Sequence, residues 1–159
     1  MKRIMEKIIP VLFLTALVIC SSCEEAPFNP GLLKTENIDI SGIWTISKVY
    51  RNEVDISEKM DFSSFSLILD YNEAGEPATY TVAAETSIPF VTNDATGRWT
   101  FDNPTYPSQM FLSSGAFTRT SYFSQSLYPV NNSNLYLEFS LGCDNITYVY
   151  HFVNSNTNE

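Results

Sequence analysis

Alternation of apolar and polar residues with a period of two restricts this chain to β-structure more than any other feature of its sequence. In Phe65–Tyr71 apolar side chains recur at every second position, and the same period returns in Leu135–Leu141 and Ile146–Phe152. A strand places successive side chains on opposite faces, so this pattern is typical of strands with one buried face. The chain is also rich in Tyr and Phe, with 9 and 11 residues, and both favour strands.

Eight such segments are predicted, and short turns such as Asn72–Gly75 separate them. Antiparallel strands that follow one another form an up-and-down meander, and closing the meander into a barrel removes its exposed edges. We therefore predict an all-β fold: a single eight-stranded up-and-down antiparallel barrel, similar to that of lipocalins. The predicted strands are Ser41–Tyr50, Phe65–Tyr71, Ala78–Glu85, Gly97–Phe101, Gln109–Ser113, Phe117–Tyr128, Leu135–Leu141 and Ile146–Phe152.

One short segment, Asp55–Met60, is predicted to be helical, because Asp55 and Glu58 have the spacing of a capping box. With Asp61, these residues would gather three carboxylates on one side of a helical turn. Calcium loops need denser Asp and Asn spacing and a glycine at the sharp turn. Capping and solubility explain the three acidic residues better, and we predict no metal site.

The N-terminal residues have the order of a secretory signal. Lys2, Arg3 and Lys7 precede an apolar run, Ile8–Ile19, which ends before small residues and cysteines. The run is shorter than the roughly 20 residues that a transmembrane helix needs. We therefore predict a signal peptide over residues 1–22.

The residues Ser22 and Cys23 resemble the lipobox of bacterial lipoproteins, in which the cysteine thiol is acylated and becomes the first residue of the mature protein. Cys20 fits less well, because Ile19 would occupy the small-residue position. The resemblance implies that Cys23 attaches the protein to a lipid bilayer of the cell envelope, at the outer membrane and facing either the periplasm or the cell surface. The alternative is an ordinary secreted protein with a cysteine near its cleavage site by chance.

The remaining chain divides into three predicted parts: a flexible tether at residues 23–38, the barrel domain at 39–154 and a frayed tail at 155–159. Removing residues 1–22 takes away three of nine basic and one of eighteen acidic residues, which leaves a formal charge of −11. Such acidity without a basic stripe excludes a nucleic-acid partner. Acylation of Cys23 would also leave Cys143 without an intramolecular disulfide partner.

Gly42-Ile43-Trp44 begins the first predicted strand, and this Gly-x-Trp pattern resembles the signature of the lipocalin superfamily. There the tryptophan closes one end of an eight-stranded barrel. Strand number and spacing extend the resemblance over residues 40–153, most closely to short lipocalin-like domains of Gram-negative lipoproteins of unknown role. Of the residues that characterise the lipocalins, only Gly42 and Trp44 have counterparts in this sequence. A Thr-Asp-Tyr motif, an arginine near the last strand and a long C-terminal helix are missing. The resemblance implies a reduced relative of the lipocalins.

The aromatic residues suggest what the barrel does. The interior of an eight-stranded barrel is either filled by side chains or just large enough for one small ligand. We predict non-catalytic binding of a small apolar or sugar-like ligand, and the alternative is a filled barrel that serves as a structural or interaction subunit of a cell-envelope complex. That alternative predicts an exposed apolar or aromatic patch within residues 104–128. The candidate pocket-lining residues are Phe65, Tyr80, Trp99, Phe101, Tyr148 and Tyr150.

Residues for catalysis are scarce. His151 is the only histidine, and the alternation places it on the face opposite Tyr150 and Phe152, so we expect it to point outward. Cys143 lies eight residues away, and that spacing predicts no Cys–His pair. The sequence has no Gly-rich phosphate loop, no G-x-S-x-G nucleophile elbow and no Cys/His metal spacing. We therefore predict that the protein is not an enzyme and holds no cofactor.

Overall fold

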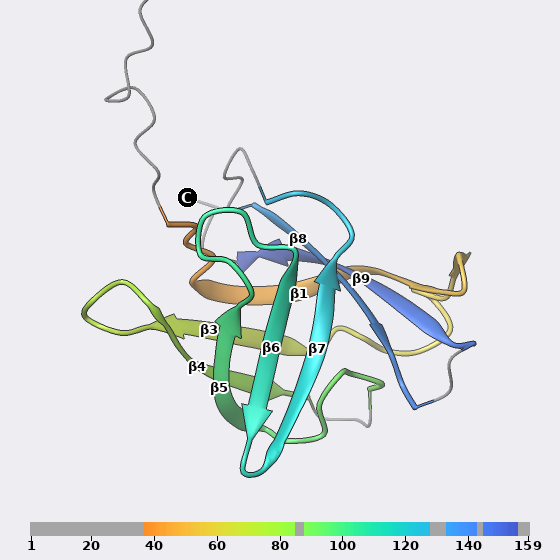
Figure 1. The fold of residues 1–159 in the computed structure, drawn as a ribbon. Helices are drawn as coiled ribbons and strands as arrows, with labels where there is room; N and C mark the ends of the chain where they lie inside the picture. The colour runs from red at the N-terminus through yellow and green to blue at the C-terminus, as the bar shows by residue number, and fades with distance from the viewer. Residues whose placement is uncertain (1–36, 85–87, 128–132, 143–144, 156–159) are drawn as a thin grey trace, which may run out of the picture. The chain divides into compact units, whose positions relative to one another are not determined.

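A computed structural model describes residues 37–84, 88–127, 133–142 and 145–155. The predicted signal peptide, Cys20, Cys23, Cys143 and almost all of the predicted tether and tail lie outside these residues. The described residues form nine strands and no helix (Figure 1). The strands are β1 (Gly42–Arg51), β2 (Val54–Asp55), β3 (Ser66–Tyr71), β4 (Pro77–Ala83), β5 (Thr96–Phe101), β6 (Gln109–Ser114), β7 (Phe117–Phe123), β8 (Asn134–Ser140) and β9 (Thr147–Asn154).

No helix in the described part of the chain is long and apolar enough to cross a membrane.

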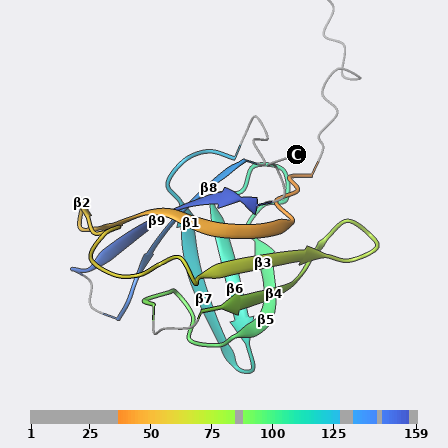
Figure 2. The same cartoon turned by 180° about the vertical axis from the view of Figure 1, so that it is seen from behind.

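The sheet closes on itself through β1. This strand pairs with β3 on one side and with β9 on the other, and each strand from β3 to β8 pairs antiparallel with the next one in sequence. Eight strands thus form a closed barrel, and the two-residue β2 adds to the end of β1 (Figures 1 and 2). The predicted all-β fold, an up-and-down antiparallel barrel of eight strands, is confirmed.

The prediction of a helix over Asp55–Met60 is wrong. Asp55 instead belongs to β2, and its carboxylate accepts hydrogen bonds from the backbone N–H and the hydroxyl of Ser57, at 2.9 and 2.6 Å. The Ser57 hydroxyl in turn accepts a hydrogen bond from the N–H of Val49, and Ile56 N–H donates to the Val49 carbonyl. These bonds tie the segment to β1 and compete with the helical pattern that its capping residues favour.

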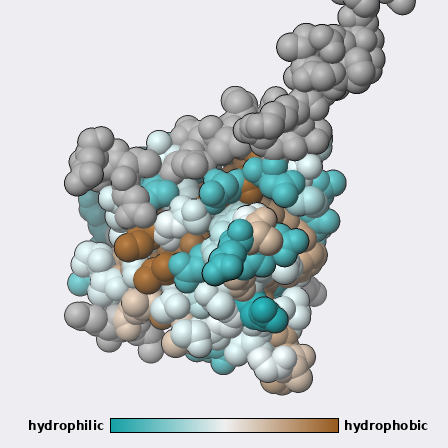
Figure 3. All heavy atoms as spheres, turned by 90° about the vertical axis from the view of Figure 1, so that its left-hand side faces the viewer, coloured by the Kyte–Doolittle hydropathy of each residue, from teal (hydrophilic) through white to brown (hydrophobic). Residues whose placement is uncertain are grey.

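Alternating residues of every barrel strand fill the interior. On β3 the inward residues are Leu67 and Leu69, and on β8 they are Leu135, Leu137 and Phe139, all of them buried. Outward positions are mostly polar, and in Figure 3 hydrophilic and intermediate surface covers most of one face, with apolar surface confined to small areas. The interior is therefore the hydrophobic core of the domain.

One end of the barrel is sealed by the residues that precede β1. Ile38 and Ile40 are buried there, and the Tyr71 hydroxyl donates a hydrogen bond to the Ile38 carbonyl at 2.8 Å. The indole N–H of Trp44 donates to the Ile40 carbonyl at 2.9 Å. Burial raises the pKa of the Tyr71 hydroxyl well above its usual range. Tyr71 and Trp44 thus hold the entering chain against what we call the sealed end.

The opposite end, the loop end, is covered by two connecting segments. Phe62 lies just before β3 and Phe90 lies between β4 and β5, and both side chains are buried in the core. The ring of Phe90 packs against Phe65, Phe139 and Tyr150, with ring centres 5.1 to 6.2 Å apart. Two loops therefore complete the core where the strands end.

Gly42, the first residue of the Gly-x-Trp pattern, has a backbone reason to be glycine. Its φ of 135° is rare for residues with a side chain, and a β-carbon built on it would lie 2.9 Å from Nδ2 of Asn154. Asn154 ends β9 and is buried. A larger residue at position 42 would disturb the place where β1 meets β9.

Gly97 on β5 should be intolerant of substitution. A β-carbon at this position would clash with the Ser113 carbonyl oxygen and would lie 2.6 Å from Cε1 of Tyr80. Because the core is closely packed, we expect Gly97→Ala to lower the free energy of unfolding by about 1–3 kcal/mol in urea titrations. Thr96→Ala, an exposed position on the same strand, should change it by less than about 0.5 kcal/mol. Equal stability of the two variants would contradict this account of the packing.

Candidate functional site

The six candidate pocket-lining residues belong to the packed interior. Tyr80, Trp99 and Tyr150 are at most 1% exposed, and Phe65 and Tyr148 are also buried. Phe101 is half-buried, and its ring centre lies 5.1 Å from that of Trp99. Their mutual ring contacts stabilise the core. The role of these residues in lining a ligand pocket stays a prediction.

Two hollows in the surface lie at opposite ends of the barrel. Phe101 borders one of about 350 Å³ at the sealed end, together with Tyr71 and Pro104. Phe65 borders one of about 400 Å³ at the loop end, together with Phe90. Neither residue lines the larger cleft at the loop end, which we call the mouth cleft.

The mouth cleft exists because the pairing of β7 with β8 is short. Only Tyr122 and Phe123 of β7 pair with β8, opposite Glu138 and Leu137. Towards the loop end the two strands diverge, as Figure 1 shows for the β6–β7 and β8–β9 hairpins. The same register would place Thr120 opposite Ser140, but these two residues line the cleft instead. The separated edges of β7 and β8 therefore form two of its walls.

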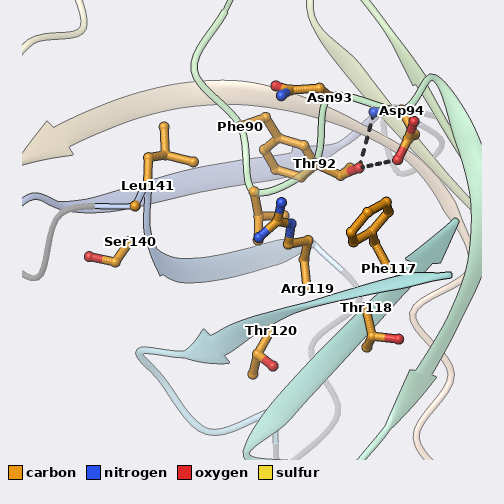
Figure 4. A pocket seen from close by; sticks show the side chains of 12 residues that line it. Phe90, Thr92, Asn93, Asp94, Phe117, Thr118, Arg119, Thr120, Ser140 and Leu141 are labelled. Carbon is orange, nitrogen blue, oxygen red and sulfur yellow. Dashed lines mark hydrogen bonds between the residues drawn. The ribbon is translucent and has the colours of Figure 1, made fainter.

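The segment that precedes β5 forms the third wall. The cleft has a volume of about 690 Å³, and Figure 4 shows its side chains. The charged residues in its described lining are Asp94 and Arg119, and the aromatic ones are Phe90 and Phe117. The lining residues are Phe90, Val91, Thr92, Asn93, Asp94, Phe117, Thr118, Arg119, Thr120, Ser140, Leu141 and Gly142.

The third wall is anchored from within the barrel. The Tyr150 hydroxyl donates a hydrogen bond to the Pro89 carbonyl, and burial raises the pKa of this hydroxyl. The Thr92 hydroxyl accepts a hydrogen bond from the N–H of Asp94 at 3.1 Å and lies 3.5 Å from its carboxylate (Figure 4). With Phe90 in the core, these contacts position the wall before any ligand arrives.

Ser121 marks the point where the strands separate. It follows Thr120 on β7, and its side chain points inward opposite Met110 on β6. Its buried hydroxyl has no hydrogen-bond partner among the described residues. Leaving a buried hydroxyl unpaired costs about 1–3 kcal/mol, so native structures contain few of them. Ser121, whose hydroxyl this is, lies one position beyond Tyr122, the residue of the last β7–β8 pair.

His151 points outward from β9, as expected from the alternation. Its ring lies between Tyr50 and Tyr136, with ring centres 5.0 and 4.5 Å away. It borders an outer cleft of about 710 Å³ together with Glu53 and Glu138. Among the residues that the structure describes, no acid, base or nucleophile forms a hydrogen bond with this ring, so the arrangement resembles no catalytic pair.

The described residues contain no group of three His, Cys, Asp or Glu side chains that could hold a metal ion. Asp55 and Asp61 point into separate local turns, in which they accept hydrogen bonds from Ser57 and Ser63. Those bonds lower the pKa of both carboxylates. Both acidic residues thus have structural roles in the loop that leads to β3.

Sequence reasoning missed the residues of the mouth cleft. Phe90 to Asp94 lie in a segment without periodicity, and nothing local in the sequence predicts that it covers the barrel end. Arg119 carried a usable signal, because it shares the inward face of β7 with Ser121 and Phe123. A charged residue at an inward position of a barrel strand indicates an opening or an end.

A family model described as a domain of unknown function (DUF5004) matches residues 22–153. Neither the curated proteins nor the solved structures include a match to this chain.

His151 should make folding dependent on pH. Burial, and to a lesser extent Lys48, lowers its pKa below the ordinary 6.5. The unfolded chain therefore takes up the proton at a higher pH than the folded one, so stability is complete above about pH 6.5 and decreases as the pH falls towards the folded-state pKa. An NMR titration of this single histidine should give a lower midpoint in the folded protein than in urea.

His151→Gln should remove that part of the pH dependence from urea titrations between pH 5 and 7. A folded-state midpoint at or above 6.5 would contradict the burial argument.

Proposed function

We propose that this chain, which belongs to the family described as a domain of unknown function (DUF5004), is a lipid-anchored, non-catalytic binding protein of the cell envelope. Its barrel resembles a reduced lipocalin, and the mouth cleft is the binding site for a small molecule. The proposed location is the outer membrane, facing either the periplasm or the cell surface.

The dimensions and composition of the mouth cleft carry this proposal. Pockets for small molecules usually measure about 300–1,000 Å³ and combine apolar walls with a few polar groups. The cleft, at about 690 Å³, combines Phe90 and Phe117 with the hydroxyls of Thr92 and Thr120. Because the core anchors the wall that contains Phe90, little ordering of that wall would accompany binding. An apolar or sugar-like molecule fits this lining.

The proposed anchor agrees with the direction in which the chain enters the barrel. Residues 37–41 lie at the sealed end, where Ile38 N–H donates to the Pro104 carbonyl at 3.0 Å. A tether that precedes residue 37 therefore joins the barrel at the end opposite the mouth cleft. The family match also begins at residue 22, next to Cys23, so that it leaves out almost all of the proposed signal peptide.

A non-catalytic role is supported by the chemistry of the two larger clefts. Among the residues that the structure describes, those that line the mouth cleft include no histidine or cysteine, and the carboxylate of Asp94 is accompanied there by hydroxyl groups. The outer cleft contains His151 without a hydrogen-bonded partner among the described residues. General acid–base or nucleophilic catalysis needs such partners in place.

The second candidate function is an interaction subunit with a filled barrel. Within residues 104–127, three aromatic side chains are largely exposed: Tyr106 at 61%, Phe117 at 69% and Tyr122 at 51%. Phe117 and Tyr122 lie near opposite ends of β7, so these side chains do not form a single patch. The scattered exposure favours the small-molecule site over a docking surface for a protein.

The anchor is tested by two cysteine variants of the full chain in Gram-negative cells fed labelled palmitate. Cys23→Ser should lose the label and leave the membrane fraction, because the acylated thiol is the only proposed attachment. Cys20→Ser is the matched control, and this variant should keep the label and stay in the membrane fraction. Label on the Cys23→Ser protein, or an unmodified N-terminus at Ser21 or beyond, would contradict the anchor.

The binding site is tested by an NMR screen of small apolar and sugar-like molecules against the processed, lipidated protein in lipid nanodiscs. Binding molecules should shift the amide signals of residues 90–94, 117–120 and 140–142. Shifts confined to the outer cleft, around Tyr50 and His151, would contradict the assignment. If nothing binds anywhere on the barrel, the interaction-subunit candidate replaces this one.

A further inference from the structure

We propose that the mouth cleft selects a small zwitterion: an α-amino acid with an apolar side chain, or a molecule of the same chemistry. This inference rests on the proposed function, because it names the class of ligand that the same cleft takes. It follows from two opposite charges that share the cleft without pairing.

The charges are those of Arg119 and Asp94, the basic and the acidic residue among the described residues that line the cleft. Arg119 comes from an inward position of β7, and Asp94 comes from the segment before β5. In the part of the chain that the structure describes, no ion pair joins Arg119 to Asp94 or to any other group. In the view of Figure 4, the ring of Phe117 lies beside the Arg119 side chain and below that of Asp94.

A ligand with two opposite charges fits this arrangement best. The guanidinium group of Arg119 can bind a carboxylate through two parallel hydrogen bonds. An ammonium group would pair with the carboxylate of Asp94, which the hydroxyl of Thr92 accompanies at 3.5 Å. A ligand with only one charge would satisfy one of these residues and be repelled by the other.

The same cleft also offers apolar surface to the uncharged part of such a ligand. Phe117 exposes 69% of its surface, although its strand position puts it on the inward side of β7. Phe90 and Leu141 add apolar surface to the same cleft. Covering these side chains would remove apolar area from water, which favours a ligand with an apolar side chain.

The unpaired strand edges offer further polar contacts. Phe123 N–H points to β6, where it donates to the Ser108 carbonyl, and Ser124 N–H points to β8, where it donates to the Tyr136 carbonyl. Because this direction alternates along a strand, the N–H groups of Thr118 and Thr120 point towards the cleft. The backbone donors on both sides of Arg119 in the chain therefore face the cleft in which the proposed carboxylate would bind.

Four labelled probes test the inference on the lipidated protein in nanodiscs: L-phenylalanine, phenylacetate, phenethylamine and benzyl alcohol. All four probes contain an aromatic ring. L-phenylalanine carries both charges, phenylacetate only the negative one, phenethylamine only the positive one, and benzyl alcohol none. Equilibrium dialysis, corrected with empty nanodiscs, gives the affinity of each probe. We expect L-phenylalanine to bind at least about tenfold more tightly than the others, because each charge-assisted hydrogen bond contributes about 1.5–3 kcal/mol.

Two variants connect that affinity to the proposed residues. Arg119→Gln and Asp94→Asn should each weaken the binding of L-phenylalanine about tenfold, because each removes one charge partner. The matched controls are Arg98→Gln, on the outward side of β5, and Glu73→Gln, in the exposed turn between β3 and β4. Both should leave the affinity unchanged, and circular dichroism should show that all four variants are folded.

The failure of this inference can be told apart from failure of the site itself. The proposed selection for a zwitterion is overturned if a singly charged or neutral probe binds as tightly as L-phenylalanine. It is also overturned if Arg119→Gln and Asp94→Asn bind L-phenylalanine with unchanged affinity. In both cases a small-molecule site remains. If no probe binds, the inference is also overturned, and the broader NMR screen then decides whether the cleft binds any small molecule.

Discussion

The pairing of β1 with both β3 and β9 is the interaction on which the rest of this structure depends. It closes the sheet, so that the inward faces of eight strands enclose one interior. Closure also removes the exposed edges that an open meander would present to other chains. The glycine at position 42 allows β1 to meet the end of β9, where the side chain of Asn154 leaves no room for a β-carbon.

Closure forces the aromatic residues inward and leaves the ends of the barrel to be completed by loops. The sealed end is held by Trp44 and Tyr71, which donate hydrogen bonds to backbone carbonyls of the entering chain. The loop end is held by Phe90 and by the hydroxyl of Tyr150. Among the described strands of the ring, β7 and β8 share the fewest paired positions, two, and this pair lies beside the second loop. The proposed binding site therefore lies where the strand pairing is least complete. The free energy of binding would offset part of the cost of leaving backbone groups of β7 and β8 without strand partners.

The fold was predictable because the strands that dominate the core carry the clearest alternation. The inward face of a strand can be predicted from local alternation alone, for example from Leu67 and Leu69 or from Tyr150 and Phe152. The limits of the strand that begins at Phe117 were harder to predict, since Arg119 and Ser121 occupy inward positions that are apolar elsewhere. Those same two polar residues lie where β7 leaves β8.

Other features depended on contacts between distant residues. The capping residues of the Asp55–Met60 segment favoured a helix, but hydrogen bonds to Val49 tie the segment to β1. The sequence identified large aromatic residues without showing whether they line a pocket or fill the core, because that depends on how closely opposite walls approach. The cleft residues Thr92 and Asp94 come from a loop whose path over the barrel end has no local sequence pattern.

Amide hydrogen exchange at three residues of β7 tests most directly whether the barrel is open where the ligand is proposed to bind. The N–H groups of Thr118, Thr120 and Tyr122 all point to the β8 side, but only Tyr122 lies within the paired part of the ladder. We expect fast exchange at Thr118 and Thr120, slow exchange at Tyr122, and slower exchange at the first two once a ligand fills the cleft. Equal protection of all three amides in the unliganded protein would mean that the ladder is continuous, and would contradict the existence of the site.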